Sequence, residues 1–245
     1  MHPIEKLSNN KIKEIQKLHQ KKYRDEMSLF IVEGEKALEE LINSDIEIVS
    51  VYSTKENVKS SILISESDMK KISTTASVCE VLAIAKQKTR CFEDIKNAKK
   101  LILLDSISDP GNLGTIIRSS AAFDVDAIIL FGNCVELYSP KVIRSCTGNF
   151  FKTPVVSVKS VNELNKYFNQ HIKVATALSK ENNISIKDCA KLDKYIVMFG
   201  AEANGLNPEL IKIADKNIRL KMSKNVESLN LSVSASIILY EIFDC

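Results

Sequence analysis

The chain has few of the residues on which many catalytic sites depend. Histidine occurs three times, as His2, His19 and His171, and none of the three lies near a glycine-rich segment. A Ser-His-Asp triad or a histidine-based metal hydrolase would need one there, so both classes are disfavoured. The six cysteines are widely spaced and form no Cys-x-x-Cys pair, which argues against zinc or haem attachment and for reduced, mostly buried thiols: Cys79, Cys91, Cys134, Cys146, Cys189 and Cys245.

Several longer patterns are also missing. No apolar run approaches the roughly 18 residues that a membrane span requires, and the first residues lack the apolar core of a signal peptide. We therefore expect a cytoplasmic protein. Neither Gly-x-Gly-x-x-Gly nor Gly-x-x-x-x-Gly-Lys occurs, and their absence argues against an enzyme that binds a dinucleotide on a doubly wound sheet or a nucleotide in a phosphate loop.

Composition allows one large domain or two modest ones, because 245 residues with 44% apolar side chains can bury a sizeable core. The net charge of +3 is too small to indicate nucleic-acid binding by itself. Residues 1–24, however, carry seven cations against two acids, a net +5. Such a segment can neutralise phosphates, or it can be the solvated face of a lysine-rich helix, and composition leaves both readings open.

Glycine is scarce, and its distribution locates the chemistry. Five of the seven glycines fall in or near a few segments of the second half. Glycine allows a sharp bend or a close approach of the backbone to a ligand. The segments are 109–118, 139–148 and 200–205, and the tetrapeptide 227–230 follows them before the last apolar stretch.

In this order, the segments resemble the signature motifs of the SpoU/TrmH branch of the SPOUT methyltransferases. The likeness lies in Asn112 with Arg118, in Gly-x-Glu-x-x-Gly at 200–205 and in Glu-Ser-Leu-Asn at 227–230, with 139–148 as a fourth match. It covers about residues 100–245 closely and the first hundred more loosely. That family methylates the ribose 2′-hydroxyl of RNA with S-adenosylmethionine, so the resemblance implies this reaction and this cofactor.

The resemblance also implies roles for individual residues. The implied catalytic residues are Asn112, Arg118, Glu202, Ser228 and Asn230. The implied cofactor contacts, made largely through backbone atoms, are Gly200, Leu220 and Leu229. The implied RNA contacts are Lys21, Lys22, Arg24 and Arg144. No metal is expected.

The chemistry of the residues leaves some of these roles open. Arg118 is a lone cation among small and apolar neighbours, which suits bidentate binding of a phosphate or carboxylate. A guanidinium is a poor base at neutral pH, so the sequence does not decide whether Arg118 removes the hydroxyl proton or only positions the group. Asn112 can cap a helix or enter the site. Glu202 can orient Arg118 or Asn230, bind a cation or cap a turn.

The second half is expected to form a parallel α/β sheet. Short apolar runs separated by helices predict strands at 101–104, 127–131, 155–158, 174–177, 196–199 and 218–220, covered on both faces. Helices are predicted at 112–123 and from Ser228 onward. Only the family resemblance implies a trefoil knot at the C-terminal end, since knots are nearly absent from proteins.

The first half is expected to be a small α/β domain. Helical spacing predicts a helix over 10–23, then a strand at 29–32 and a helix at 35–43. Further strands are predicted at 46–52, 62–64 and 81–85, with a helical segment near 74–80. Its beginning resembles the RNA-binding module, akin to ribosomal-protein RNA binders, that precedes many SpoU-type catalytic domains. The expected division is 1–90, a polar linker at 91–99, and a catalytic domain at 100–245.

Two positions depart from the family pattern. Lys221 stands where proline is usual before Met222, and Cys146 stands where serine is common. Neither change removes a reacting group. Large-subunit ribosomal RNA is the favoured substrate, and tRNA or a catalytically silent RNA-binding role are the alternatives. The last helix is apolar on nearly every side, so it must be covered on more than one, and the resemblance implies a homodimer.

Overall fold

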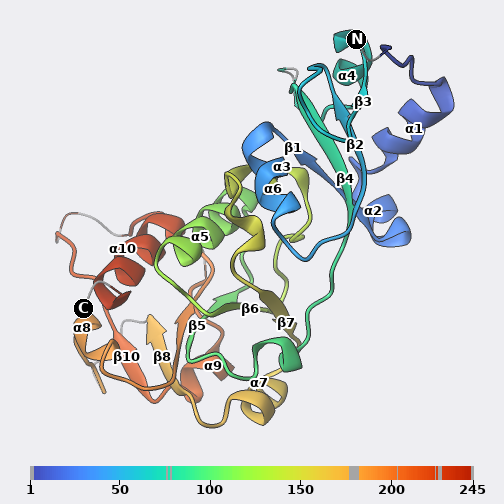
Figure 1. Ribbon diagram of the computed structural model, residues 1–245. Helices are drawn as coiled ribbons and strands as arrows, with labels where there is room; N and C mark the ends of the chain where they lie inside the picture. Colours follow the sequence, from blue (N-terminus) through green and yellow to red (C-terminus); the bar gives the residue numbers. More distant parts are fainter. Residues whose placement is uncertain are drawn as a thin grey trace. The chain divides into compact units, whose positions relative to one another are not determined.

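The computed structural model describes residues 3–75, 77, 79–176, 182–202, 204–223, 225 and 228–243. Their contacts define two compact units (Figure 1). One comprises residues 1–88 together with 136–151, and the other comprises 89–135 and 152–245. The chain therefore leaves the second unit after residue 135, contributes sixteen residues to the first, and returns at residue 152.

The second unit is built on a six-stranded sheet in the order β10-β8-β9-β5-β6-β7, and every neighbouring pair of strands is parallel. The expected parallel sheet is thus confirmed. Its strands are β5 (Lys100–Asp105), β6 (Ala127–Phe131), β7 (Val155–Val158), β8 (Ile172–Thr176), β9 (Tyr195–Phe199) and β10 (Lys216–Ile218). Its helices are α5 (Pro110–Ala122), α7 (Val161–Phe168), α8 (Ile186–Cys189), α9 (Pro208–Lys212) and α10 (Leu231–Phe243).

The central strands of this sheet are held together by burial of their apolar side chains. All five residues of β6 and of β9 are buried, as are the last five of β5. Unbroken apolar runs of this kind are typical of parallel strands covered on both faces. Helices α5 and α10, far apart in sequence, pack against each other (Figure 1). The trefoil knot stays a prediction, because strand order and pairing do not test how the chain threads.

The segment expected to be a linker is packed in the second unit. Residues Phe92–Ile95 form a short 3-10 helix, η1. Ile95 is 3% exposed within the core of the parallel sheet, and the Phe92 ring stacks on Tyr167 with centroids 3.9 Å apart. Apolar contacts of Phe92 and Ile95 therefore hold the segment 91–99 in the second unit.

The first unit contains a four-stranded sheet in the order β1-β4-β2-β3. Strand β4 is antiparallel to β1 and β2, and β3 is parallel to β2. The strands are β1 (Leu29–Glu33), β2 (Ile48–Ser53), β3 (Ile62–Leu63) and β4 (Val81–Lys86). The helices are α1 (Asn9–Lys17), α2 (Lys21–Met27), α3 (Glu35–Ile42), α4 (Glu66–Ile72), α6 (Pro140–Ser145) and the 3-10 helix η2 (Asn149–Phe151).

Helix boundaries in this unit differ from the expectation. The predicted helix over 10–23 is broken at residues 18–20 into α1 and α2, and the free carbonyl of Leu18 accepts a hydrogen bond from Arg24 Nη1 at 2.7 Å. The helix predicted near 74–80 lies earlier, as α4, because Ser65 caps its start by accepting from Asp68 N. Among the described residues of 74–80, none is helical.

Two arginine–glutamate pairs join residues 136–151 to the rest of the first unit. Arg24 donates from Nε and Nη2 to the two oxygens of Glu136, at 2.7 and 2.5 Å. Arg144 Nη1 donates to Glu33 Oε2 at 3.1 Å and to Thr74 Oγ1 at 2.5 Å. Because the pairs run in opposite directions, each part of the unit supplies one cation and one anion to the other.

None of the helices in the described part of the chain has the length and apolar character of a bilayer-spanning segment.

The buried Glu33 carboxylate generates a prediction about stability and pH. Burial would raise its pKa, but hydrogen bonds from Thr74 and Ser73 and the charge of Arg144 outweigh burial, so the pKa lies below its ordinary value. A depressed pKa stabilises the fold above the unfolded value of about 4.3, and the contribution is lost as pH falls through the lower folded value. Glu33→Gln should therefore lower the free energy of unfolding at pH 7 by about 1.5–3 kcal/mol.

Chemical denaturation of both proteins across pH measures this. The difference between wild type and Glu33→Gln should be constant above about pH 5 and shrink in acid. The exposed Glu39 is the control, and Glu39→Gln should leave the unfolding free energy nearly unchanged. A Glu33→Gln effect that persists undiminished in acid would contradict the assignment.

Candidate active site

The loop after β9 is shaped by a close crossing of backbone. A Cβ on Gly200 would lie 2.1 Å from the carbonyl carbon of Gly205 and 2.2 Å from the nitrogen of Leu206. Gly205 has φ +66°, and its N–H donates to the carbonyl of Ala201 at 2.8 Å. Glycine at 200 is thus required by the crossing chain itself, and its predicted contact with the cofactor stays a prediction.

A buried carboxylate fixes the far end of this loop. Asp105, at the end of β5 and 3% exposed, accepts a hydrogen bond from Asn207 N at 2.6 Å through Oδ2. Its Oδ1 accepts from Ser106 Oγ at 2.9 Å. Sequence reasoning did not single out Asp105, and only its position at the end of an apolar strand could have drawn attention to it.

Helix α5 begins with the cap that the sequence left undecided. Asp109 is the N-cap and accepts from Asn112 N at 2.8 Å, and Pro110 occupies the first helical turn, as is usual there. The Asn112 side chain therefore does not cap its own helix. It is 7% exposed and its amide serves another purpose.

The start of α10 is capped by Asn230. Asn230 Oδ1 accepts hydrogen bonds from Ser232 N at 2.9 Å and Val233 N at 3.3 Å, and from Ser232 Oγ at 2.7 Å. The helix begins at Leu231, three residues after the predicted start at Ser228. Ser228 is free of the capping role.

These caps fix a chain of hydrogen bonds, which we call the amide relay: Asn230, Asn112 and Glu202. Because Asn230 Oδ1 already accepts donors from the helix, its amide nitrogen faces Asn112 and donates to Asn112 Oδ1 at 3.0 Å. Asn112 must then present its own nitrogen to Glu202, and it donates to Glu202 Oε1. Each amide has one orientation that satisfies all its partners.

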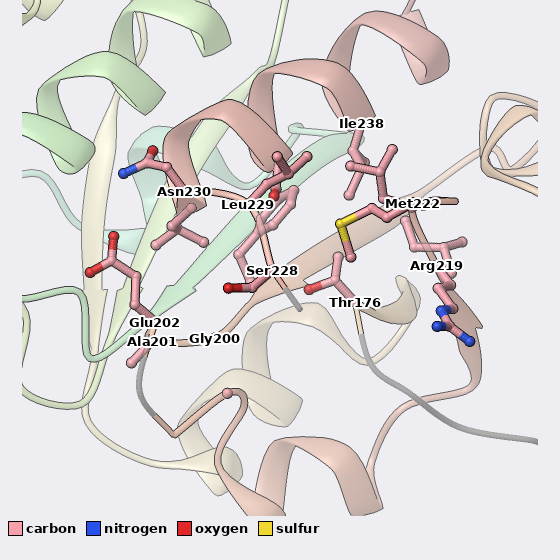
Figure 2. A pocket seen from close by; sticks show the side chains of 16 residues that line it. Thr176, Gly200, Ala201, Glu202, Arg219, Met222, Ser228, Leu229, Asn230 and Ile238 are labelled. Atoms are coloured by element: carbon pink, nitrogen blue, oxygen red, sulfur yellow. The ribbon is translucent and has the colours of Figure 1, made fainter. Parts of the chain in front are cut away.

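The relay borders a pocket of about 430 Å³ at the carboxyl ends of β8, β9 and β10. Figure 2 shows Glu202 and Asn230 on one side of it and Met222 and Arg219 on the other. Six residues predicted for the site line the pocket: Gly200, Glu202, Leu220, Ser228, Leu229 and Asn230. Other lining residues, which sequence reasoning missed, include Thr176, Arg219 and Ser234; no motif marked them.

Arg118 lies outside this lining. It is exposed on α5 between two buried isoleucines and the half-buried Ser119, and it forms no ion pair or hydrogen bond with the described residues. Asn112 does not line the pocket either and reaches it only through Glu202 and Asn230. Of the expected motifs, Ala203 and Glu227 lie outside the described residues, so Gly-x-Glu-x-x-Gly and Glu-Ser-Leu-Asn are each seen in part.

The four basic residues predicted to contact RNA are placed differently. Lys21 and Lys22 are exposed, but Lys21 pairs with Asp25 at 2.7 Å. Arg24 is only 3% exposed, with its guanidinium bound inside the unit as described above. Arg144 donates Nη1 to Glu33 and Thr74 and keeps about a third of its side chain accessible. Of these four residues, Lys22 alone has no ionic partner among the described residues.

Cys146, which stands where serine is common, does not line the pocket. The residue is buried, its Sγ lies 3.1 Å from the carbonyl oxygen of Val142, and burial raises the pKa of the thiol to about 12. A thiol so far from ionisation is unreactive. The described residues contain no group of three His, Cys, Asp or Glu side chains able to hold a metal ion.

Two family models and a full-length relative match the chain. The model of the SpoU rRNA Methylase family matches residues 99–240, and that of the MRM3-like substrate binding domain matches residues 9–88. The chain is 28% identical to the 23S rRNA (guanosine(2553)-2′-O)-methyltransferase RlmP of Bacillus subtilis, over 99% of both chains.

The fold also superposes on solved structures of methyltransferases over nearly the whole chain. An AdoMet-bound rRNA methyltransferase from Sinorhizobium meliloti superposes with a TM-score of 0.86 at 26% identity, covering 98% of this chain and 96% of that one. An RNA 2′-O ribose methyltransferase superposes with a TM-score of 0.81 at 27% identity, over 98% of both chains.

Proposed function

Because the chain belongs to the SpoU rRNA methylase family, we propose that it transfers a methyl group from S-adenosylmethionine to a ribose 2′-hydroxyl of 23S ribosomal RNA. The full-length similarity to the Bacillus subtilis enzyme supports the choice of RNA. The observation that carries the catalytic part is the amide relay beside the pocket. We also propose a cytoplasmic location, which fits the similarity to the Bacillus subtilis enzyme.

The pocket suits the cofactor in size, place and lining. Its volume falls in the range of about 300–1,000 Å³ that small-molecule sites occupy, and ligands of open parallel sheets bind at the carboxyl ends of the strands. Apolar side chains such as Ile218 and Leu229 can cover a flat ring, while the backbone at Gly200 and Leu220 offers polar groups. When bound, S-adenosylmethionine supplies an electrophilic methyl group on a sulfonium centre.

The residues of this chain must then hold the ribose oxygen in line with that methyl group. Bound S-adenosylmethionine would supply the methyl carbon to the 2′-oxygen and keep the electron pair of the broken carbon–sulfur bond on its sulfur, and the hydroxyl proton would pass to Glu202. Glu202 keeps Oε2 without a hydrogen bond from the described residues, so this oxygen can accept from the hydroxyl. Fixed placement of reacting groups accounts for a large share of such rate enhancement.

Arg118 is assigned to the RNA rather than to the cofactor. Its guanidinium is exposed, has no ionic partner in the described chain and does not line the pocket. A planar group with several donors suits bidentate binding of a phosphate oxygen pair. We therefore assign Arg118 to holding the RNA backbone so that the ribose lies at the relay.

Two alternatives make different demands. A catalytically silent RNA-binding protein would have no need of a relay in which both amides are held in one orientation beside a pocket. A tRNA enzyme would need the same site, so only the identity of the methylated RNA separates it from the proposal.

Arg118→Ala should abolish methyl transfer while leaving cofactor affinity nearly intact. Tritiated methyl transfer to unmodified 23S rRNA and to unmodified tRNA, in single turnover, measures activity and substrate together, and calorimetry measures cofactor binding. Wild type should label 23S rRNA. Arg219→Ala is the matched control, since it changes an arginine on the pocket wall and should weaken cofactor binding instead. Activity retained by Arg118→Ala would refute its assignment, and label in tRNA alone would refute the proposed substrate.

We also propose a homodimer built through α10. Val233, Ile237 and Tyr240 on this helix are 47%, 37% and 50% exposed, which is unusual for large apolar side chains gathered on one helix. An isologous contact between two copies would bury them on both subunits at once.

Ile237→Glu should convert the dimer into monomers, because it would place two like charges in an apolar contact. Sedimentation of the full chain at micromolar concentration measures this. Ile211 is 45% exposed on α9 and serves as the control, so Ile211→Glu should leave the mass unchanged. A wild-type chain that sediments as a monomer would disprove the dimer.

A further inference from the structure

Several of the cations on the basic helices α1 and α2 are paired with anions, so only part of the positive charge is available to bind a phosphate. Lys11 pairs with Glu14 at 3.2 Å and Lys21 pairs with Asp25 at 2.7 Å, both on the surface. Arg24 is buried against Glu136. These three cations are matched by anions within the same unit, so they add little net charge to the surface.

Of the other three lysines, Lys13 is exposed on α1 without an ion pair or ring contact among the described residues, and the remaining two lie at an aromatic ring. Lys17, the last residue of α1, and Lys22, in the first turn of α2, are exposed and form no ion pair with the described residues. Both ammonium groups lie beside the ring of Tyr23, at 5.5 and 5.7 Å from its centroid. A cation near the face of an aromatic ring is attracted by the ring's quadrupole. We call these three residues the Tyr23 cluster.

The interruption of the helix between α1 and α2 creates this arrangement. Lys17 and Lys22 come from different helices, and the turn at 18–20, held by the Arg24–Leu18 hydrogen bond, brings them to one ring. Arg24 therefore has an indirect part, since its hydrogen bond fixes the turn that connects the two helices carrying these lysines.

We propose that the Tyr23 cluster binds backbone phosphates of the RNA substrate, and that Lys21 and Arg24 do not. This rests on the proposed function, because it names the part of the first unit that holds the RNA. Two ammonium groups that lie at one ring, without ionic partners among the described residues, offer positive charge to the phosphates of an RNA backbone. The ring contributes by limiting the freedom of two long side chains, which reduces the entropy lost when they bind.

The test measures binding of the full-length protein to in vitro transcribed, unmodified 23S rRNA by filter retention, without cofactor, over a range of salt concentrations. Replacing both lysines, as Lys17→Gln with Lys22→Gln, should weaken binding and flatten the plot of log affinity against log salt by roughly 0.7–0.9 for each phosphate that the protein no longer neutralises. Both side chains are exposed, so the variant should keep the melting temperature of the wild type.

A matched control removes a neighbouring pair without changing net charge. The double change Lys21→Gln with Asp25→Asn should leave affinity and salt slope as in the wild type. Tyr23→Phe keeps the ring and should bind normally, whereas Tyr23→Leu should bind more weakly. An unchanged slope in the Lys17/Lys22 variant, or an equal loss in the Lys21/Asp25 variant, would overturn the proposal.

The outcomes separate this inference from the proposed reaction. If the wild type methylates 23S rRNA but the lysine variants keep its salt slope, the Tyr23 cluster is wrongly assigned and the enzyme activity stands. If the slope changes as expected but no methyl group is transferred, the phosphate binding stands and the proposed reaction fails.

Discussion

The hydrogen bonds that join Asn230, Asn112 and Glu202 are the constraint on which the site depends. They connect the start of α10, the start of α5 and the loop that crosses over Gly200, three parts of the chain more than a hundred residues apart at the extremes. The first acceptor, Asn230 Oδ1, is held by helix N–H groups that need a partner in any case. Helix capping thereby orients the side-chain amides, and the amides orient a carboxylate at the pocket.

Much of this architecture could be predicted from local sequence. Buried strands such as β6 and β9 are continuous apolar runs, which are typical of a parallel sheet, and each pairs in parallel with β5. The residues of the relay were found by motif, yet their partners were not. A sequence pattern does not show that Asp109 takes the cap and thereby frees Asn112, or that a crossing backbone fills the space beside Gly200.

In the basic N-terminal segment, too, the sequence does not show which side chains are paired. Sequence treats Lys21, Lys22 and Arg24 as equivalent cations, because it does not reveal their partners. The structure separates them: one is paired at the surface, one lies beside an aromatic ring, and one is buried against Glu136, more than a hundred residues away. Contacts over such distances depend on the chain excursion at 136–151, which no local periodicity indicates.

Exchange of one atom tests the central role of the relay most directly. Asn230→Asp keeps an oxygen to cap α10, where aspartate is as good as asparagine, but it removes the nitrogen that donates to Asn112. The account predicts a melting temperature close to that of the wild type and a single-turnover methylation rate lower by about 10- to 100-fold, because Asn112 can turn its nitrogen away from Glu202. A variant with the wild-type rate would show that the relay does not order the site.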